Sequence, residues 1–259
     1  MRNILAIASK ELKSYFSSPI GWILLGFWSL LYGYFFVAIL NFFVRQSMQM
    51  SQFGQAGPQA MNLNQQLLRP LVAQNLPILI LFLLPAVTMR TYSEERRSGT
   101  IELLLTSPLS DFQIIMGKFL GAMSLYTVML GVTLIHIGVL VGYGGRPEWK
   151  PIVTVYLGLL LLGGCFISVG LFISSLTKNQ IVAGISTFAV FLMLWVINWI
   201  GTFVGPTMQT VLTFLSLTDH FDDFSRGVID TKHVIYYLSF MAFGLFLTAK
   251  SVDSERWRG

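Results

Sequence analysis

Six apolar runs of about 16 to 25 residues divide this chain, and they constrain its fold more than any other feature. None of them contains Asp, Glu, Lys or Arg, and His136 is the one basic side chain within them. A helix needs roughly 20 such residues to cross about 30 Å of hydrocarbon. The sequence therefore predicts an all-α integral membrane protein in which residues 1–259 form a single domain with six transmembrane helices. The predicted spans are 20–44, 71–89, 119–141, 152–176, 181–204 and 234–249.

The composition supports the same class of protein. Hydrophobic residues make up 54% of the chain and charged residues 11%, whereas a soluble protein carries about 25% charged residues. The single cysteine, Cys165, lies in an apolar run, so no disulfide framework or thiolate metal site is expected.

Several polar residues stand where the predicted helices begin. Ser18 precedes Pro19 at the first span, and Asp230 is expected to cap the sixth. Ser110-x-x-Gln113 and Thr177-x-x-Gln180 have the spacing of capping boxes and are predicted to open the third and fifth spans.

Basic residues indicate which side of the membrane each loop faces. Cytoplasmic loops carry an excess of Lys and Arg, and one alternate set of loops holds most of them. An even number of spans places both termini on that side, so both are predicted to be cytoplasmic. The predicted outer segments are 45–70, 142–151 and 205–233. The richer set contains Arg2, Lys10, Lys13, Arg90, Arg96, Arg97, Lys118, Lys178, Lys250, Arg256 and Arg258, and the poorer set contains Arg45, Arg69, Arg146, Lys150, Arg226 and Lys232.

Residues 1–18 have the pattern of an amphipathic helix that lies in the membrane interface and contacts lipid. Apolar residues recur at helical spacing on one face, and Lys10 and Lys13 lie on the other. Lys10, Glu11 and Lys13 interrupt what would be the apolar core of a signal peptide, so cleavage is not expected. The alternative is a simple charged flank of the first span.

Residues 94–110 form a charged island between the second and third spans. Gly99 is expected to end a helix that carries Glu94 to Arg97, and Pro108 to close a second, short helix. That helix would present Ile101, Leu104 and Leu105 on one face, a form suited to docking in a partner's groove. A solvated connector is the alternative that the residues alone leave open.

The island and other segments resemble a known family. The run SEERRSGTIELLLTSPLS followed by GKFLGA is similar to the signature of the ABC type-2 exporter permeases, the membrane halves of ATP-driven exporters. Further segments resemble the branch described as gliding-motility-associated. They are KELKSYFSSPIGW, LLPAVTMRTYSEE, GLFISSLTKNQIVAG and SRGVIDTKHVIYYLS, and the likeness covers nearly the whole chain.

The resemblance implies a function as a permease in the bacterial cytoplasmic membrane that exports an unidentified substrate. It implies that the interfacial helix and the coupling helix between spans two and three bind a separate ATPase subunit. It also implies short outer helices within 205–230, and a second copy or a sister permease as partner. The implied docking residues are Lys10, Glu11 and Lys13 in the first helix, and Glu94, Glu95, Arg96, Arg97, Gly99, Thr100, Glu102, Leu105 and Pro108 in the loop.

The sequence contains no GxxxxGK[ST] phosphate loop, since Gly117-Lys118 is followed by Phe119. We therefore expect no enzymatic activity and no bound cofactor, with ATP and Mg²⁺ held by the partner subunit. No nucleic-acid partner is expected, because the basic residues flank apolar spans.

Pro77 and Pro85 are predicted hinge positions in the second span. Gly117-xxx-Gly121 and Gly201-xxx-Gly205 offer close-packing faces, within the chain or between copies.

Three further hypotheses stay open at this point. An ion-coupled secondary transporter would show carboxylates within its spans, which are absent here. A membrane enzyme would show convergent catalytic groups, which only residues 219–223 approach. A mechanical component of a surface machine is compatible with the gliding-motility-associated branch.

His136 is expected to be a neutral imidazole bonded to a neighbouring helix. Asp219, His220, Asp222 and Asp223 are expected to form a solvated cap rather than a metal site.

Overall fold

The computed structural model describes residues 2–52, 62–101, 109–201 and 203–256. Within these residues all regular structure is helical, and six helices are long and apolar enough to cross a membrane, as predicted. In chain order the elements are α1 Arg2–Ser17, α2 Pro19–Gln52, the π-helix η1 Asn64–Asn75, α3 Leu76–Thr88, α4 Ser93–Ser98, α6 Asp111–Gly142, α7 Trp149–Leu176, α8 Gln180–Gly201, α9 Pro206–Leu215, α10 Leu217–Ser225 and α11 Thr231–Arg256.

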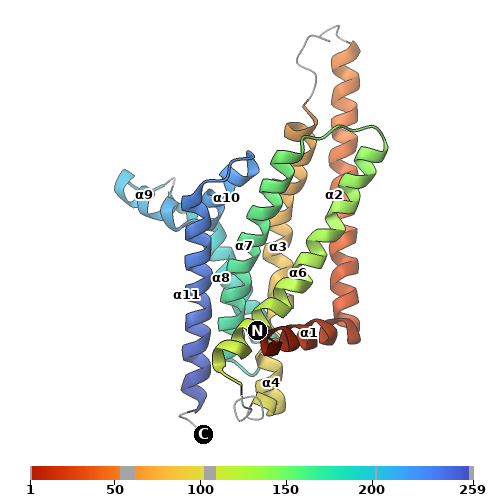
Figure 1. The fold of residues 1–259 in the computed structure, drawn as a ribbon. Helices are drawn as coiled ribbons and strands as arrows, with labels where there is room; N and C mark the ends of the chain where they lie inside the picture. Colours follow the sequence, from red (N-terminus) through yellow and green to blue (C-terminus); the bar gives the residue numbers. More distant parts are fainter. Residues whose placement is uncertain (1, 53–61, 102–108, 202, 257–259) are drawn as a thin grey trace.

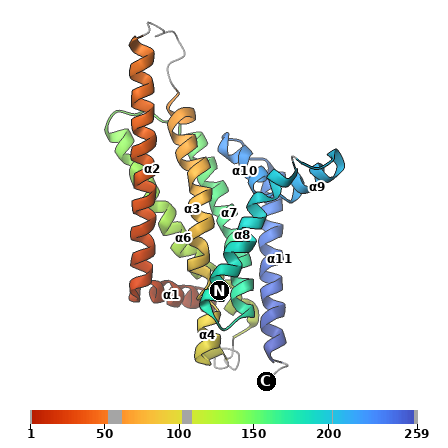
Figure 2. The same cartoon turned by 180° about the vertical axis from the view of Figure 1, so that it is seen from behind.

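The long helices run side by side, with α3 and α7 in the centre and α2 and α11 towards opposite edges (Figures 1 and 2). α1 lies across one end of this bundle, beside α4 and at the same end as the last turns of α11. We call this the α1–α4 end. The short helices α9 and α10 lie at the opposite end, the α9–α10 end, in the position predicted for short helices before the last span. The segments containing α3 and α7 are the most buried of the six.

Aromatic side chains with a polar tip anchor the core. The Trp28 indole N–H donates to the carbonyl of Met129 at 2.7 Å, and this joins α2 to α6. The Tyr126 hydroxyl donates to the carbonyl of Leu159 at 2.7 Å, which joins α6 to α7. Both rings are fully buried, and the polar atom of a buried Tyr or Trp usually finds a partner of this kind.

The helix starts agree with most of the predicted caps. Ser18 accepts from the N–H of Ile20 at 3.2 Å, Ser110 from that of Gln113 at 3.3 Å, and Asp230 from that of Lys232 at 2.9 Å. The predicted box at Thr177 and Gln180 is wrong. Asn179 directly precedes α8, and its side-chain oxygen accepts from the N–H of Ile181 at 2.9 Å instead.

The helices extend beyond the apolar runs, because only the stretch within hydrocarbon has to be apolar while a helix continues into polar residues. The clearest case is the second span, where helical structure begins at Asn64 rather than at Leu71. Pro70 lies inside η1 and supplies no backbone N–H. The wider π-helical turn accommodates this missing donor.

Candidate coupling site at the α1–α4 end

The charged segment after α3 forms the helix α4, which projects from the bundle (Figure 1). Arg90 donates to Glu94 through its Nε at 2.9 Å, one turn apart. Gly99 has φ of +72°, and this left-handed conformation ends the helix as predicted. Thr100 and Ile101 are helical again. Glu102, Leu105 and Pro108 of the predicted coupling helix lie outside the described residues.

Lys118 is the centre of the polar network at this end. Its ammonium donates to Glu11 Oε1 of α1 at 2.9 Å, to Glu95 Oε1 of α4 at 2.8 Å and to the backbone carbonyl of Thr91 at 2.8 Å. It also lies 5.0 Å from the centre of the Tyr92 ring. The Lys118 side chain is only 1% exposed. One buried cation therefore joins α1, α4 and α6.

The burial of this ammonium is stable only because its partners are in place. A buried charge without a partner costs several kcal/mol, and a Lys ammonium has three N–H groups to satisfy. Glu11, Glu95 and the carbonyl of Thr91 satisfy all three. Loss of one partner would leave the others in place, whereas loss of both carboxylates would isolate the charge.

Two glycines of α6 allow α1 to approach closely enough for this network. A Cβ added at Gly117 would lie 2.6 Å from the Cβ of Ile7, and one added at Gly121 would lie 2.6 Å from the Cβ of Glu11. Real Cβ atoms do not come so close. The Gly117-xxx-Gly121 pair therefore packs within the chain and forms the surface of α6 that α1 contacts.

Tyr15 fixes the second half of α1. Its hydroxyl donates to the carbonyl of Val87 in α3 at 2.8 Å, and the side chain is buried. Burial raises the pKa of the Tyr15 phenol above its ordinary value, so the group remains a donor at neutral pH. A cavity of about 30 Å³ beside it, lined by residues such as Ser14 and Arg90, has room for about one water molecule.

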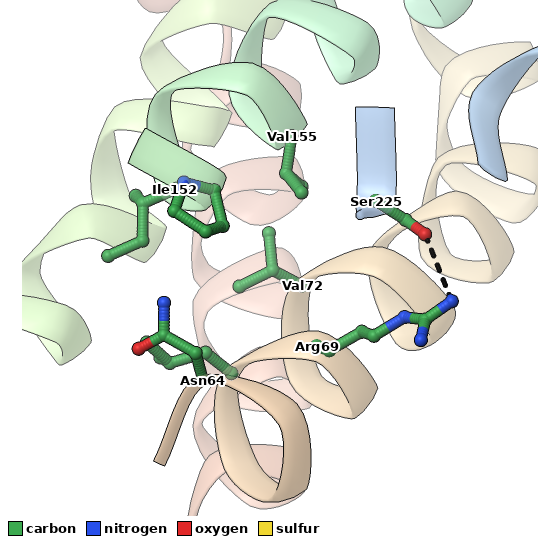
Figure 3. Close-up of a pocket in the computed structure, with 8 residues that line it drawn as sticks. Asn64, Arg69, Val72, Ile152, Val155 and Ser225 are labelled. Atoms are coloured by element: carbon green, nitrogen blue, oxygen red, sulfur yellow. Dashed lines mark hydrogen bonds between the residues drawn. The ribbon is translucent and has the colours of Figure 1, made fainter. Parts of the chain in front are cut away.

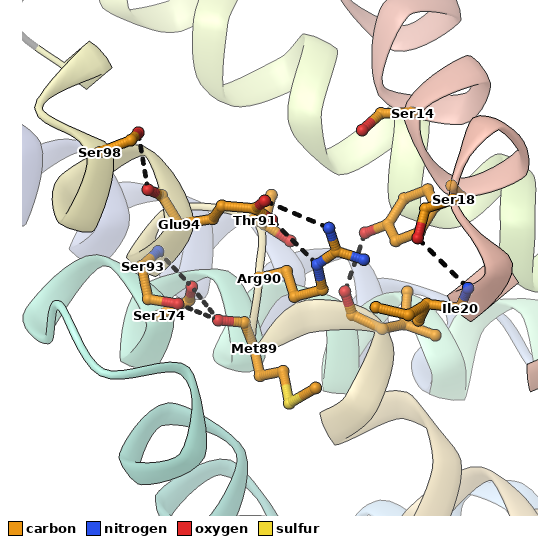
Figure 4. Close-up of polar contacts among 12 residues, drawn as sticks. Ser14, Ser18, Ile20, Met89, Arg90, Thr91, Ser93, Glu94, Ser98 and Ser174 are labelled. Atoms are coloured by element: carbon orange, nitrogen blue, oxygen red, sulfur yellow. Dashed lines mark hydrogen bonds and ion pairs between the residues drawn. The ribbon is translucent and has the colours of Figure 1, made fainter.

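Ser174 of α7 ties α7 to the segment before α4 (Figure 4). Its hydroxyl oxygen accepts from the N–H groups of Tyr92 and Ser93, both at 3.1 Å. Its proton is donated to the carbonyl of Met89 at 3.1 Å. A hydroxyl has one donor and two acceptor positions, so the backbone of this turn satisfies the whole hydrogen-bonding capacity of the Ser174 hydroxyl.

Arg96 and Ser175 extend the connection to the last span. The Arg96 guanidinium donates to the carbonyl of Ser175 at the end of α7. The Ser175 and Ser251 hydroxyls lie 2.9 Å apart, so α7 is bonded to α11 at the same level. α4 is thereby bonded directly to α7 and α6, and through Ser175 of α7 to α11.

The predicted docking residues fall into two groups. Glu11, Glu95 and Arg96 are held by internal bonds, and Glu94 is paired with Arg90. The second group is exposed and consists of Lys10, Lys13, Arg97, Gly99 and Thr100. Residues of the second group are available to a partner, as is the exposed Glu94, whereas Glu11, Glu95 and Arg96 hold α1 and α4 in position.

In the sequence Lys118 stands out only as a basic residue near the membrane, and Tyr15, Ser174 and Ser175 do not stand out. One signal for Lys118 was present, because it stands among apolar residues next to a span. Charged groups in such positions usually pair with each other. Ser174 has no comparable signal, since hydroxyls are common in membrane helices.

The predicted cluster of Asp219, His220, Asp222 and Asp223 at the α9–α10 end does not converge on one point. Asp222 pairs with Arg226 at 2.6 Å and with Arg69 at 3.3 Å, whereas Asp223 accepts from or donates to His233 at 2.7 Å. Figure 3 shows Arg69 reaching Ser225 across a narrow cavity of about 30 Å³ between η1, α7 and α10. The cavity has room for about one water molecule and is too small for a substrate.

His136 of α6 packs between aromatic rings of α2. The ring centres of Tyr32 and Phe36 lie 5.0 and 5.2 Å from that of His136 in edge-on arrangements. Its Nδ1 has no hydrogen-bond partner among the residues that the structure describes. The expected interhelical hydrogen bond is therefore replaced, on that side of the ring, by aromatic packing. Carboxylates that could relay a proton are absent from the α2 and α6 segments around it.

Comparison with known proteins supports the family suggested by the residues. The family model described as ABC-2 family transporter protein matches residues 5–233. The chain is 29% identical over 147 residues to the probable multidrug ABC transporter permease YbhR of Escherichia coli strain K12, and equally to that of Escherichia coli O157:H7. These alignments cover 55% of this chain and 38% of each relative, so the chain spans well under half of the curated relatives that it matches.

Proposed function

We propose that this chain, which belongs to the ABC-2 family of transporter proteins, is the membrane permease subunit of an ATP-driven exporter and receives its ATPase subunit at the α1–α4 end. The observation that carries the proposal is the Lys118 network. It binds the two elements that would face the ATPase, α1 and α4, to the start of α6 through one buried cation. A force applied to either element therefore reaches the membrane helices directly.

The distribution of charges supports one orientation of the subunit in the membrane. Lys10, Lys13, Arg90 and Arg97 lie on α1 or beside α4, so the α1–α4 end is the more basic end. The excess of Lys and Arg favours the cytoplasmic side for this end and for both termini. ATP and Mg²⁺ would be bound there by the partner subunit, because the sequence contains no phosphate loop.

The other partners are membrane lipid and a second permease. The α8 and α11 helices are the least buried of the spans together with α2, and their outward faces are apolar. Such faces suit lipid or another permease, as a homodimer or with a sister subunit. We place the chain in the gliding-motility-associated branch of these permeases on the sequence segments that resemble it.

The cargo that fits this subunit is amphipathic. The spans offer no charged lining for a small ion, and the relatives in Escherichia coli are named as probable multidrug transporters. A lipid-like or drug-like molecule is compatible with apolar helix faces. This assignment rests on the permease function.

Docking can be tested by purification in mild detergent with a tag on the C-terminus, followed by an ATPase assay of what co-purifies. The variant Lys10→Ala/Lys13→Ala/Arg97→Ala removes three exposed positive charges from the α1–α4 end. The control, Arg146→Ala/Lys150→Ala, removes two exposed positive charges from the opposite end.

We expect an ATP-hydrolysing subunit to co-purify with the unaltered chain and with the control, and to be lost from the triple variant. Equal recovery of the subunit with the triple variant and with the control would rule out docking at the α1–α4 end. Purification of the chain without any ATPase across several detergents would contradict the permease function itself.

A further inference from the structure

Two buried histidines and an aspartate form a chain of hydrogen bonds at the α9–α10 end. His220 Nε2 lies 3.0 Å from the carbonyl oxygen of Phe214, and His220 Nδ1 lies 2.5 Å from His233 Nδ1. His233 Nε2 then lies 2.7 Å from Asp223 Oδ2. The exposed fractions of His220 and His233 are 8% and 7%. The chain connects the end of α9, the helix α10 and the first turn of α11.

The protons of this chain can be counted from its geometry. A carbonyl oxygen only accepts, so His220 Nε2 carries a hydrogen and, in a neutral ring, His220 Nδ1 carries none. His233 Nδ1 must then carry one, because two lone pairs cannot face each other at this distance. His233 Nε2 faces a carboxylate, which again requires one proton between the two atoms.

The count leaves one proton more than two neutral imidazoles and an ionised carboxylate hold. The alternative with a charged His220 gives the same total, because His233 would then be neutral and donate to Asp223. The three side chains therefore carry no net charge in the observed arrangement. Without the additional proton one of the three hydrogen bonds cannot form.

The groups around the site disfavour a positive charge on His220. Burial lowers the pKa of His220, and the neighbouring His233 and Lys232 act in the same direction, against the Phe214 carbonyl and Asp219. Burial raises the pKa of Asp219, against the hydrogen bond with Ser216 and the neighbouring His220. Asp230 is occupied by Lys232, whose backbone N–H and ammonium contact its two oxygens at 2.9 and 3.1 Å.

The remaining charged groups near these helices are engaged elsewhere or lie at helix ends. Arg69 of η1 pairs with Asp222 and not with the histidines. α8 and α9 contain no acidic or basic side chain, and α7 contributes Lys150 in its first turn. The rings of Tyr236 and Tyr237 in α11 pack against His220, with Tyr236 stacked at 3.8 Å. The carboxylate of Asp223 is thus the negative group bonded directly to His233.

We propose that His220, His233 and Asp223 form a binding site for one shared proton, and that this proton fastens α9 and α10 to α11. The site is closed while the proton is bound and opens as the pH rises and the proton leaves. A second proton on His220, which its lowered pKa delays, would set two N–H groups against each other and open the site at more acidic pH. This inference does not depend on the proposed transport function.

A larger cavity, already open to the surroundings, borders the site. It has a volume of about 640 Å³ and is lined by residues of α9, α10 and α11, among them Phe214, His220, His233 and Tyr236. Its walls belong to the elements that the shared proton holds together. Release of the proton is therefore expected to change the shape of this cavity.

The proton can be observed directly by nitrogen-15 NMR of the full-length chain in lipid nanodiscs with labelled histidine. The sequence has three histidines, and His136→Gln assigns the one outside the site. We expect a through-hydrogen-bond coupling between the two Nδ1 atoms at mildly acidic pH. As the pH rises we expect the loss either of this coupling or of the hydrogen bond at one Nε2 atom, because only two of the three bonds can then form. Independent titration of His220 and His233 without any coupling would overturn the proposal.

A single substitution separates a proton site from a merely structural contact. In Asp223→Asn the amide N–H can donate to His233 Nε2, His233 Nδ1–H to His220, and His220 Nε2–H to Phe214, with no additional proton. Hydrogen exchange of the α9 and α10 amides, corrected for intrinsic rates, measures opening. In the unaltered chain, protection is expected to fall about tenfold or more on raising the pH from about 5 to 8.

Asp223→Asn is expected to keep its protection over the same pH range, and the control His136→Gln to behave as the unaltered chain. If Asp223→Asn loses protection at every pH, Asp223 is a structural acceptor and the proton site is refuted. The same conclusion follows if Asp223→Asn retains the pH dependence of the unaltered chain.

Discussion

The two carboxylates that hold Lys118 are predicted to cost far more when removed together than separately. Glu11→Gln and Glu95→Gln each leave the ammonium with one carboxylate and with the carbonyl of Thr91. The double variant leaves a cation that is 1% exposed with neutral partners alone. The three contacts are all 2.8 to 2.9 Å long, so both carboxylates bind the ammonium directly.

The magnitude follows from the type of interaction that each variant removes. Each single variant exchanges one charge-assisted hydrogen bond for a neutral one, at a cost of about 1 kcal/mol. An isolated buried charge costs about 3 to 5 kcal/mol. For a chain of this size 1 kcal/mol corresponds to about 2 to 4 °C in Tm. We therefore expect each single variant to lose about 2 to 4 °C and the double variant about 6 to 20 °C.

The assay is thermal unfolding of the purified chain in one detergent, with all variants measured side by side. Adding Lys118→Met to the double variant removes the isolated charge and is expected to restore most of the decrease in Tm, since the new glutamine amides can donate to Thr91. Decreases of the two single variants that simply add up in the double variant would refute the argument. So would a failure of Lys118→Met to restore stability.

Three further predictions concern neighbouring contacts. Gly121→Ala places a Cβ 2.6 Å from that of Glu11 and is expected to lower the stability by about 1 to 3 kcal/mol and to weaken binding of the ATPase. In the control Gly131→Ala the added Cβ meets open space. Equal Tm values of the two variants would contradict the close packing of α1 on α6. Ser174→Ala leaves the N–H groups of Tyr92 and Ser93 and the carbonyl of Met89 without that partner, and should cost about 1 to 3 kcal/mol in thermal unfolding. Pro85→Ala is expected to slow ATP-coupled transport in proteoliposomes while preserving stability, because Pro85 interrupts the backbone bonding of α3 and is predicted to act as a hinge. Unchanged transport would remove Pro85 from the mechanism, and Pro77 in the first turn of α3 would remain as the second predicted hinge.

Local rules were sufficient for most of the architecture. Runs without charge predicted the six spans, and the polar residues before them predicted three of four helix starts. Gly99 predicted the end of α4 because only glycine readily adopts positive φ. The box at Thr177 failed because two acceptors, Thr177 and Asn179, stand near the same helix start, and spacing alone does not decide between them.

The site could be predicted only in part, because its function depends on contacts between distant segments. The sequence indicated that Glu11 and Glu95 are charged and lie near the membrane, and both were assigned to the partner-facing surface. In the structure they point to Lys118, which is 107 and 23 positions away in the chain. The spacing of residues along a helix carries no information on such pairs. A charge within an apolar neighbourhood was the available signal, and it favours an internal partner over an external one.

The two polar sites are connected through a single helix. At the α1–α4 end, α7 holds the backbone before α4 through Ser174. At the opposite end, Thr154 of α7 donates to the carbonyl of Phe224 at 3.2 Å, and Gly158 packs directly against the Phe224 side chain of α10. The 28 residues of α7 span about 42 Å.

A rigid element in contact with both sites lets each influence the other, and such coupling is reciprocal. If ATPase binding shifts α7, proton binding at His233 must respond by the same free energy. The pH dependence of hydrogen exchange in α10 should therefore differ between the free chain and its complex with the ATPase, and identical profiles would show that α7 does not connect the two ends.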